Sequence, residues 1–307
     1  MVAPNPPIPF DTAFDPQTGE AVEVAPQVVR VTAPNVGPYT FRGTNSFLVG
    51  ADALFVLDPG PDNSGHLEAL QRAIAGRPVE AIVLTHTHRD HTALVRRLQA
   101  ATGAPVWFGG RHRSSRRPRL FELDPVAADS DWKLVPDRVL ADGERIAAGG
   151  VALEVVATPG HCANHLAFGL VDTRWLLTGD HIMGWNSTVV PVPDGSMADY
   201  LRSLERVIGL AYAHYLPAHG GPIVNGKAYA QALLAHRELR NRQVITAVEA
   251  GATSIGELQR RIYPTLALPL RAAARMTLMA HVEYLTELGR IGASNGPFGL
   301  TLSPSRA

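Results

Sequence analysis

Four potential metal ligands occur within six residues of one another in the segment Thr85-His86-Thr87-His88-Arg89-Asp90-His91. The segment follows an apolar run over residues 79–84, which is typical of a strand buried on both faces, and precedes a predicted helix over residues 92–101. A loop at the carboxyl end of a strand can direct three imidazoles and one carboxylate at a single point. Nitrogen and oxygen ligands of this kind suit zinc, iron or manganese. The segment therefore predicts a metal site within a layered α/β protein.

The composition indicates a folded protein with a large core. Hydrophobic residues make up 46% of the 307 and charged residues 18%. The 28 Lys and Arg residues balance the 28 Asp and Glu residues, which argues against coating nucleic acid through bulk charge. A single cysteine, Cys162, excludes an intrachain disulfide. Because neither a long apolar stretch nor a leader with a basic start is visible, we expect a cytoplasmic protein with no membrane partner.

Strand and helix patterns alternate in the first half of the chain, and shorter strands separated by turn residues follow in the middle. From about residue 228 the pattern is helical, ahead of two short strands that could form a wing. We therefore expect an α/β (α+β) protein in four parts: an extended arm over residues 1–27, a main domain over 28–230, a small winged-helix-like helical domain over 231–302 and a loose tail over 303–307.

Three further ligand-type residues each follow a predicted strand. His161 ends Thr-Pro-Gly-His, Asp180 ends Thr-Gly-Asp, and His219 lies in Pro-Ala-His-Gly. Glycine or proline beside each residue restricts the loop that carries it. Any one of the three could equally be structural. Together with the first segment they supply seven ligands, which is enough for two adjacent metals.

In the order of these motifs, the chain resembles the metallo-β-lactamase superfamily over roughly residues 28–225. The resemblance implies a four-layer αββα sandwich with the site at one edge between two sheets, and two zinc ions per chain, with iron or manganese as alternatives. Asp58, in a Leu-Asp-Pro-Gly turn, would support the metal loop by this resemblance; taken alone it is typical of a turn. The resemblance also assigns the ligands: one metal takes His86, His88 and His161, the second takes Asp90, His91 and His219, and Asp180 bridges the two.

The expected chemistry follows from the charges. Two dications a few ångströms apart lower the pKa of a shared water from about 15.7 toward 7, and the hydroxide attacks a carbonyl or phosphoryl centre. Asp90 is the expected catalytic residue, since it both binds metal and can orient the nucleophile or receive its proton. By the same resemblance, a carboxylate at Asp180 and an imidazole at His88 imply a hydrolase, different from the common antibiotic-degrading branch and from di-iron redox members of the family.

The C-terminal region carries a second resemblance. His236-Arg237, Arg240 and Gln243-Val244-Ile245, with the helices that follow, are similar to the subfamily of glyoxalase II and the mitochondrial lactamase-β-like endoribonuclease. In that subfamily a winged-helix-like domain follows the hydrolase domain. The small domain could shape the mouth of the active site, form a homodimer contact or bind nucleic acid.

Several residues have weaker cases. We expect His165 and His181 to support the ligands, and Asn186 and Ser187 to contact substrate. A basic loop offers further candidate substrate contacts, with a solvated loop as the alternative: Arg111, Arg113, Arg116 and Arg117. The remaining isolated histidines are expected on the surface or in the core: His66, His112, His214, His236 and His281.

Three functions are consistent with these features. The first is a dinuclear-metal-dependent hydrolase acting on a small acyl substrate, namely a thioester, lactone or amide, including a β-lactam. The second is a metal-dependent endoribonuclease or phosphodiesterase acting on single-stranded RNA, which the basic loop favours and the zero net charge disfavours. The third is a non-catalytic nucleic-acid-binding regulator that uses the winged-helix-like unit.

Overall fold

The computed structural model describes residues 8–119, 122, 124–296 and 299–305, and within these it contains two large β-sheets. The first sheet has its strands in chain order: β1 (Ala21–Ala25), β2 (Val28–Thr32), β3 (Asn45–Val49), β4 (Leu54–Leu57), β5 (Val79–Val83), β6 (Val106–Phe108) and β7 (Arg138–Val139). The second sheet has the order β12-β11-β10-β9-β8: β8 (Arg145–Ala148), β9 (Val151–Ala157), β10 (Leu166–Leu170), β11 (Trp175–Gly179) and β12 (His214–Pro217).

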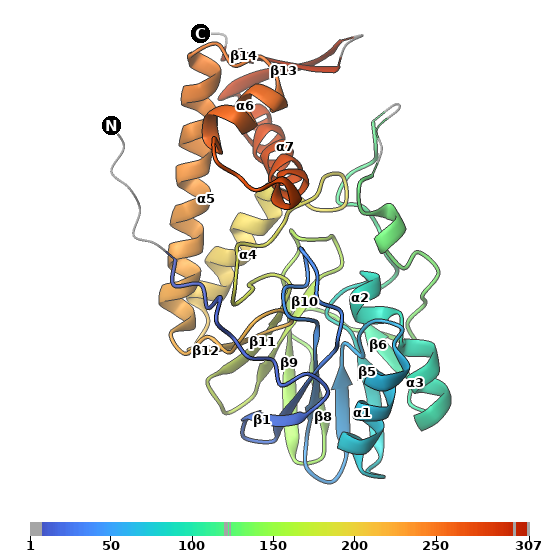
Figure 1. Cartoon of the computed structure of the whole chain (residues 1–307). Helices are drawn as coiled ribbons and strands as arrows, with labels where there is room; N and C mark the ends of the chain where they lie inside the picture. The colour runs from blue at the N-terminus through green and yellow to red at the C-terminus, as the bar shows by residue number, and fades with distance from the viewer. Residues whose placement is uncertain (1–7, 120–121, 123, 297–298, 306–307) are drawn as a thin grey trace.

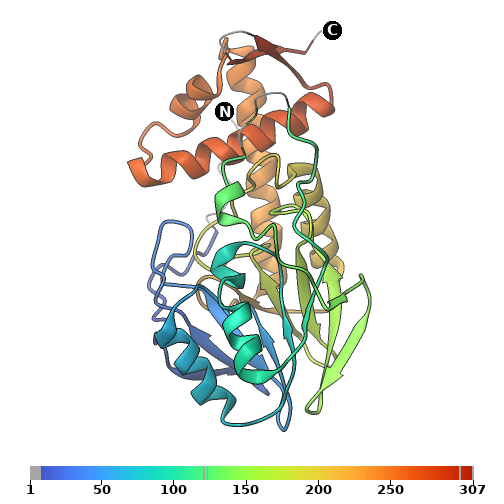
Figure 2. The same cartoon turned by 90° about the vertical axis from the view of Figure 1, so that its right-hand side faces the viewer.

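Helices cover the outer face of each sheet (Figures 1 and 2). The helices are α1 (Ser64–Ile74), α2 (Arg89–Thr92), α3 (Val95–Thr102), α4 (Met197–Gly209), α5 (Gly226–Glu249), α6 (Ile255–Ile262) and α7 (Arg271–Glu287), with two short 3-10 turns at Ala127–Asp129 and Leu268–Leu270. None of the helices in the described part of the chain combines the length and hydrophobicity that a bilayer crossing requires.

Alternation along the strands builds the layers. In β4, Leu54 and Val56 pack against α1 and α3, whereas Phe55 and Leu57 point into the core between the two sheets. On the other sheet, α4 and the first half of α5 cover the outer face, where buried Tyr200 lies. The strands β3, β4 and β10 are buried along their whole length because each sheet is covered on both sides there. The predicted four-layer αββα sandwich is therefore confirmed.

Both ends of the described chain are more regular than predicted. The arm expected over residues 1–27 contains β1, which pairs antiparallel with β2. The tail expected over residues 303–307 begins too early, because Ser303 and Pro304 pair with Gly292 and Ile291. In both segments a neighbouring strand satisfies backbone groups that an isolated segment would leave to water. Residues 1–7 and 306–307 lie outside the described residues.

The C-terminal region has its own hydrophobic core. Apolar residues of α5, α6 and α7 pack there with the hairpin of β13 (Ile291–Gly296) and β14 (Gly299–Pro304). The stripe Leu278, Val282 and Leu285 on α7 is buried in this core. Helix α5 is continuous from the main layers into this region (Figure 2), so the predicted boundary between residues 230 and 231 falls inside one helix.

Candidate metal centre

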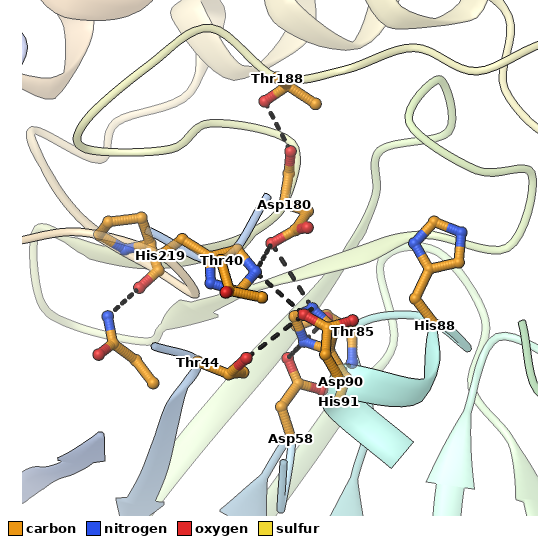
Figure 3. A network of polar contacts seen from close by, with 12 residues as sticks. Thr40, Thr44, Asp58, Thr85, His88, Asp90, His91, Asp180, Thr188 and His219 are labelled. Atoms are coloured by element: carbon orange, nitrogen blue, oxygen red, sulfur yellow. Dashed lines mark hydrogen bonds and ion pairs between the residues drawn. The ribbon is translucent and has the colours of Figure 1, made fainter. Parts of the chain in front are cut away.

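The loop after β5 is fastened by Asp58, which follows β4, the strand parallel to β5. Asp58 Oδ1 accepts a hydrogen bond from the Thr85 backbone N–H (2.8 Å), and Oδ2 accepts one from Thr85 Oγ1 (2.7 Å). His91 Nδ1 lies 3.0 Å from the same Oδ2. One buried carboxylate therefore fixes both the start of the ligand loop and a histidine at its end, as Figure 3 shows.

A group of three histidines converges at one side of the site. His88 Nδ1 lies 3.1 Å from His86 Nε2 and 2.9 Å from His161 Nε2. The opposite ring nitrogens are held by oxygens: His86 Nδ1 lies 3.0 Å from Thr85 Oγ1, His161 Nδ1 2.7 Å from the Val189 carbonyl, and His88 Nε2 2.8 Å from Asp194 Oδ2. Because those nitrogens donate to oxygen, the nitrogens that face one another carry the lone pairs that a metal requires.

A second group, formed by Asp90, His91 and His219, lies beside the first. Asp90 Oδ2 is 3.2 Å from His91 Nε2 and 3.2 Å from His219 Nε2. Asp180 lies between the two groups: its Oδ1 is 3.3 Å from His219 Nε2, and its Oδ2 is 3.6 Å from His161 Nε2. Figure 3 shows Asp90, His91, Asp180 and His219 directed at one another, with His88 to one side.

The charges of these residues, and their buried polar atoms without a hydrogen-bond partner, suit a pair of cations. His91 Nε2 and Asp180 Oδ1 are buried without a hydrogen-bond partner in the described part of the chain. Burial lowers the pKa of His161 to about 4, which keeps that imidazole neutral. Burial acts in the same direction on His219, but Asp180 and Asp90 outweigh it and raise its pKa to about 10. Without a metal, protons on imidazole thus balance the two carboxylates, and a dication can take their place.

All seven residues of the predicted ligand set are brought together. Three sets of residues each have their ligand atoms within 4.8 Å of one another. The sets are His86, His88 and His161; His86, His91 and Asp180; and Asp90, His91 and His219. The seven residues come from five segments of the chain: the β5–α2 loop, α2, and the segments after β9, β11 and β12. That these residues bind two metals stays a prediction.

Two supporting residues were not predicted. Asp194, in a Pro-Asp-Gly sequence typical of a turn, is fully buried and orients His88. Its other carboxylate oxygen lies 3.5 Å from His112 Nε2, and His112 Nδ1 lies 2.8 Å from Thr87 Oγ1. His112 was expected on the surface or in the core, and it instead links the ligand loop to the Asp194 segment. Nothing in the local sequence distinguishes Asp194 from a turn residue.

We expect Asp194→Asn to weaken metal binding about 10- to 100-fold, because His88 loses the carboxylate that holds its ring and its tautomer. Competition with a chromophoric chelator measures the affinity. The exposed Asp52 supplies the control Asp52→Asn, which should bind metal like the wild type. Equal affinity of Asp194→Asn and the control would contradict the role assigned to Asp194.

The two histidines predicted to support the ligands differ in their surroundings. His165 Nε2 accepts a hydrogen bond from the Asp180 backbone N–H (3.0 Å), and its Nδ1 lies 2.8 Å from Thr158 Oγ1. His181 is fully buried against the ring of Tyr200 (5.0 Å between centroids), and neither ring nitrogen has a partner in the described residues. His165 therefore positions Asp180, whereas among the described residues no hydrogen bond joins the His181 ring to a ligand.

A close backbone approach holds the loop that carries His161. Gly160 has φ of +141°, and a Cβ there would lie 2.4 Å from Tyr200 Cα in α4. We expect Gly160→Ala to lower the free energy of unfolding by about 2–3 kcal/mol, because helix backbone must move. Gly209→Ala on the same helix is the control, since a Cβ there meets nothing within 4 Å. Urea unfolding compares them, and equal midpoints would refute the prediction.

A cavity of about 280 Å³ opens onto the ligand cluster. His88, Asp90, Asp180 and His219 form part of its lining, together with the predicted substrate contacts Asn186 and Ser187. Much of the remaining wall is apolar or aromatic: Tyr39, Met183, Trp185, Val189, and Ala273 and Met276 of α7. Trp185 stacks on Phe41, with ring centroids 4.7 Å apart. Helix α7 thus closes one side of the cavity, which the sequence did not specify.

The arginines of the basic loop, which were predicted to contact substrate, are absent from the lining of this cavity in the described part of the chain. Arg116 Nε donates to Glu283 Oε2 of α7 (3.0 Å), and Arg116 Nη1 donates to Glu122 (2.6 Å). Arg113 Nη2 donates to the Ala163 carbonyl (3.1 Å). Arg111 and Arg117 are exposed and are absent from the described cavity lining. The acceptors beside it make Arg116 a link between this loop and α7.

The fold and the site define a class of protein. The sequence profile described as the Metallo-beta-lactamase superfamily matches residues 39–219, a segment that holds all seven clustered residues. The chain therefore belongs to this superfamily and is a hydrolase.

Particular relatives extend over most of the chain. It is 29% identical over 295 residues to the lactamase-like protein vrtG of Penicillium aethiopicum, covering 85% of this chain and 88% of that protein. It is 27% identical over 249 residues to an atrochrysone carboxyl ACP thioesterase of Paecilomyces divaricatus, covering 79% and 71%. A metallo-beta-lactamase family protein from Thermus thermophilus superposes with a TM-score of 0.75 at 26% identity, covering 92% of this chain and 100% of that one.

Proposed function

We propose that the protein is a dinuclear-metal-dependent hydrolase that cleaves a small acyl substrate, with a thioester as the first candidate and lactones and amides as alternatives. The observation that carries the proposal is the convergence of buried imidazoles and carboxylates at the end of a largely apolar cavity. The thioesterase among the relatives supports the choice of thioester.

The clustered residues would have different roles in this reaction. His86, His88 and His161 would hold one metal, Asp90, His91 and His219 the other, and Asp180 would contact both. When bound, such a pair supplies a water of lowered pKa and stabilises negative charge on the carbonyl oxygen. Asp90 is the carboxylate that can orient that water or take its proton, because its side chain is 28% exposed whereas that of Asp180 is 6% exposed.

The cavity wall favours an acyl chain over a nucleic acid. Tyr39, Met183 and Trp185 offer apolar surface for a hydrocarbon segment. Arg116, a candidate for holding the RNA phosphates of the alternative function, is paired with Glu122 and Glu283 instead. These contacts make the endoribonuclease the second candidate.

We also infer the finer features of the family resemblance. Nitrogen and oxygen ligands in the proposed arrangement suit zinc. The packing of α6 and α7 with the β13–β14 hairpin supports a winged-helix-like unit of the glyoxalase II and endoribonuclease-like subfamily. Ala273 and Met276 of α7 favour a role for this unit at the mouth of the active site.

A substrate panel tests the proposed function. Zinc-loaded protein is assayed on N-acetylcysteamine thioesters, a lactone, a β-lactam and single-stranded RNA, with His88→Ala as the control. We expect acyl hydrolysis that His88→Ala abolishes. RNA cleavage without acyl hydrolysis, lost in His88→Ala, would favour the endoribonuclease instead. Any cleavage that survives in His88→Ala belongs to a contaminant.

A further inference from the structure

A second cavity, of about 200 Å³, adjoins the one at the metal centre. The two share lining residues from the loop after β11 and from the start of α7: Asn186, Ser187, Val189, Leu270 and Ala273. Helix α5 contributes His236, Arg237 and Arg240 to the second cavity, and Tyr263 lies beside them. A substrate in the metal cavity therefore lies next to a second cavity that is lined by the positively charged Arg237 and Arg240.

Both guanidiniums have unfilled hydrogen-bonding capacity. Arg237 is only 2% exposed, donates from Nη2 to the Thr188 carbonyl and lies over the Tyr200 ring. Arg240 donates to Gln243 Oε1 (2.8 Å) and lies 4.1 Å from the centroid of the Tyr263 ring. The Nε atoms of both arginines are buried and have no acceptor among the described residues. Each guanidinium can thus donate to a ligand.

No acid neutralises this pair in the described part of the chain. The lining contains neither Asp nor Glu, and no carboxylate lies at ion-pair distance from Arg237 or Arg240. His236 is nearby, but burial, followed by the two arginines, lowers its pKa to about 4, so it is neutral at pH 7. Arg237 is buried and Arg240 is half-buried. Positive charges in such surroundings are costly without a counter-charge, and an anion offsets that cost.

We propose that this second cavity binds an anionic group, a carboxylate or a phosphate, carried by the substrate whose acyl bond lies at the metal centre. The inference rests on the proposed function and narrows its substrate class to acyl compounds with a second, negatively charged end. Arg240 contacts the anion directly. Arg237 both faces the anion and holds the loop at Thr188, whose hydroxyl donates to the Asp180 carbonyl (2.7 Å).

Two matched pairs of thioesters test where the anion lies. Pentanoyl and glutaryl N-acetylcysteamine differ by a carboxylate on the acyl side. Pentanoyl-pantetheine and its 4′-phosphate differ by a phosphate on the thiol side. We expect the zinc-loaded wild type to prefer the charged member of one pair by about tenfold or more in kcat/KM, and Arg240→Gln to lose that preference. The pair that shows the preference identifies the source of the anion.

Two variants on the same helix sharpen the test. Arg240→Lys keeps the charge and should retain part of the preference, and exposed Arg242→Gln should retain all of it. A wild type with no preference in either pair, or an Arg240→Gln variant that keeps the preference, overturns the proposal.

Direct binding separates this inference from the proposed function. If the wild type cleaves none of the four thioesters, the thioesterase form of the proposed function fails, and anion binding alone then tests the proposal for the second cavity. Inorganic phosphate and glutarate are titrated at constant ionic strength while thermal unfolding is followed. Stabilisation that is smaller in Arg240→Gln than in the wild type and Arg242→Gln supports the cavity, because anions bound at the metals would stabilise all three equally. An anion-dependent increase in the unfolding midpoint that is equal in the three proteins overturns the proposal for the second cavity.

Discussion

Asp180→Asn is expected to lower kcat/KM on an acyl substrate by about 1000-fold or more and to reduce the metal content to about one ion per chain or fewer. Asp180 is the one carboxylate placed between the two ligand groups, with Oδ1 3.3 Å from His219 Nε2 and Oδ2 3.6 Å from His161 Nε2. An amide keeps the shape of the side chain but removes the charge that two adjacent cations require.

Elemental analysis and steady-state kinetics on the same preparation measure both effects of Asp180→Asn. The exposed Asp62 gives the matched variant Asp62→Asn, which should keep wild-type metal content and turnover. Circular dichroism establishes that both variants are folded. Full metal content and near-wild-type activity in Asp180→Asn would contradict the role of Asp180 as a metal ligand.

Asp58→Ala is expected to lower the free energy of unfolding of the metal-free protein by about 3–5 kcal/mol. The change leaves the Thr85 N–H, the Thr85 hydroxyl and His91 Nδ1 without their buried acceptor. Asp58 also has φ of +49°, a left-handed conformation that alanine adopts less readily than aspartate or asparagine. Urea unfolding in the presence of a chelator measures the loss apart from metal linkage.

Asp58→Asn provides the matched comparison. Asparagine tolerates the left-handed backbone and keeps one acceptor oxygen for Thr85, so we expect about half of the loss seen with alanine. A loss below about 1 kcal/mol for Asp58→Ala would show that water replaces the carboxylate and that Asp58 does not hold the loop.

The seven residues that cluster could be predicted because each carries a local signal. His86, His161 and Asp180 all follow apolar strands and stand beside turn residues, and the ends of neighbouring strands meet at one edge of the fold. Local pattern predicted a layered α/β protein, and the family resemblance implied the four αββα layers. The structure shows the physical reason, since strands such as β4 are apolar on both faces and are covered on both sides.

The substrate region depends on contacts that no local pattern encodes. The arginines at 111–117 are close in sequence to the ligand loop, yet Arg116 is paired with Glu283, 167 residues further along the chain. Conversely, Arg237 is far from the metal loop in sequence and is held against Thr188 beside it. Charge patterning alone therefore did not predict which arginines line the cavities beside the metal centre.

The sequence by itself determined the residues available to bind metal, because the turns after apolar strands are local properties, and its resemblance to a known superfamily implied the αββα layers. Tertiary structure alone decided that Asp194 orients His88, that α7 closes the cavity and that Arg237 and Arg240 share a wall with it. These arrangements arise where α5 and α7 pack onto the loops after β11. Such packing depends on the shape of many side chains at once, and no spacing of residues along the chain records it.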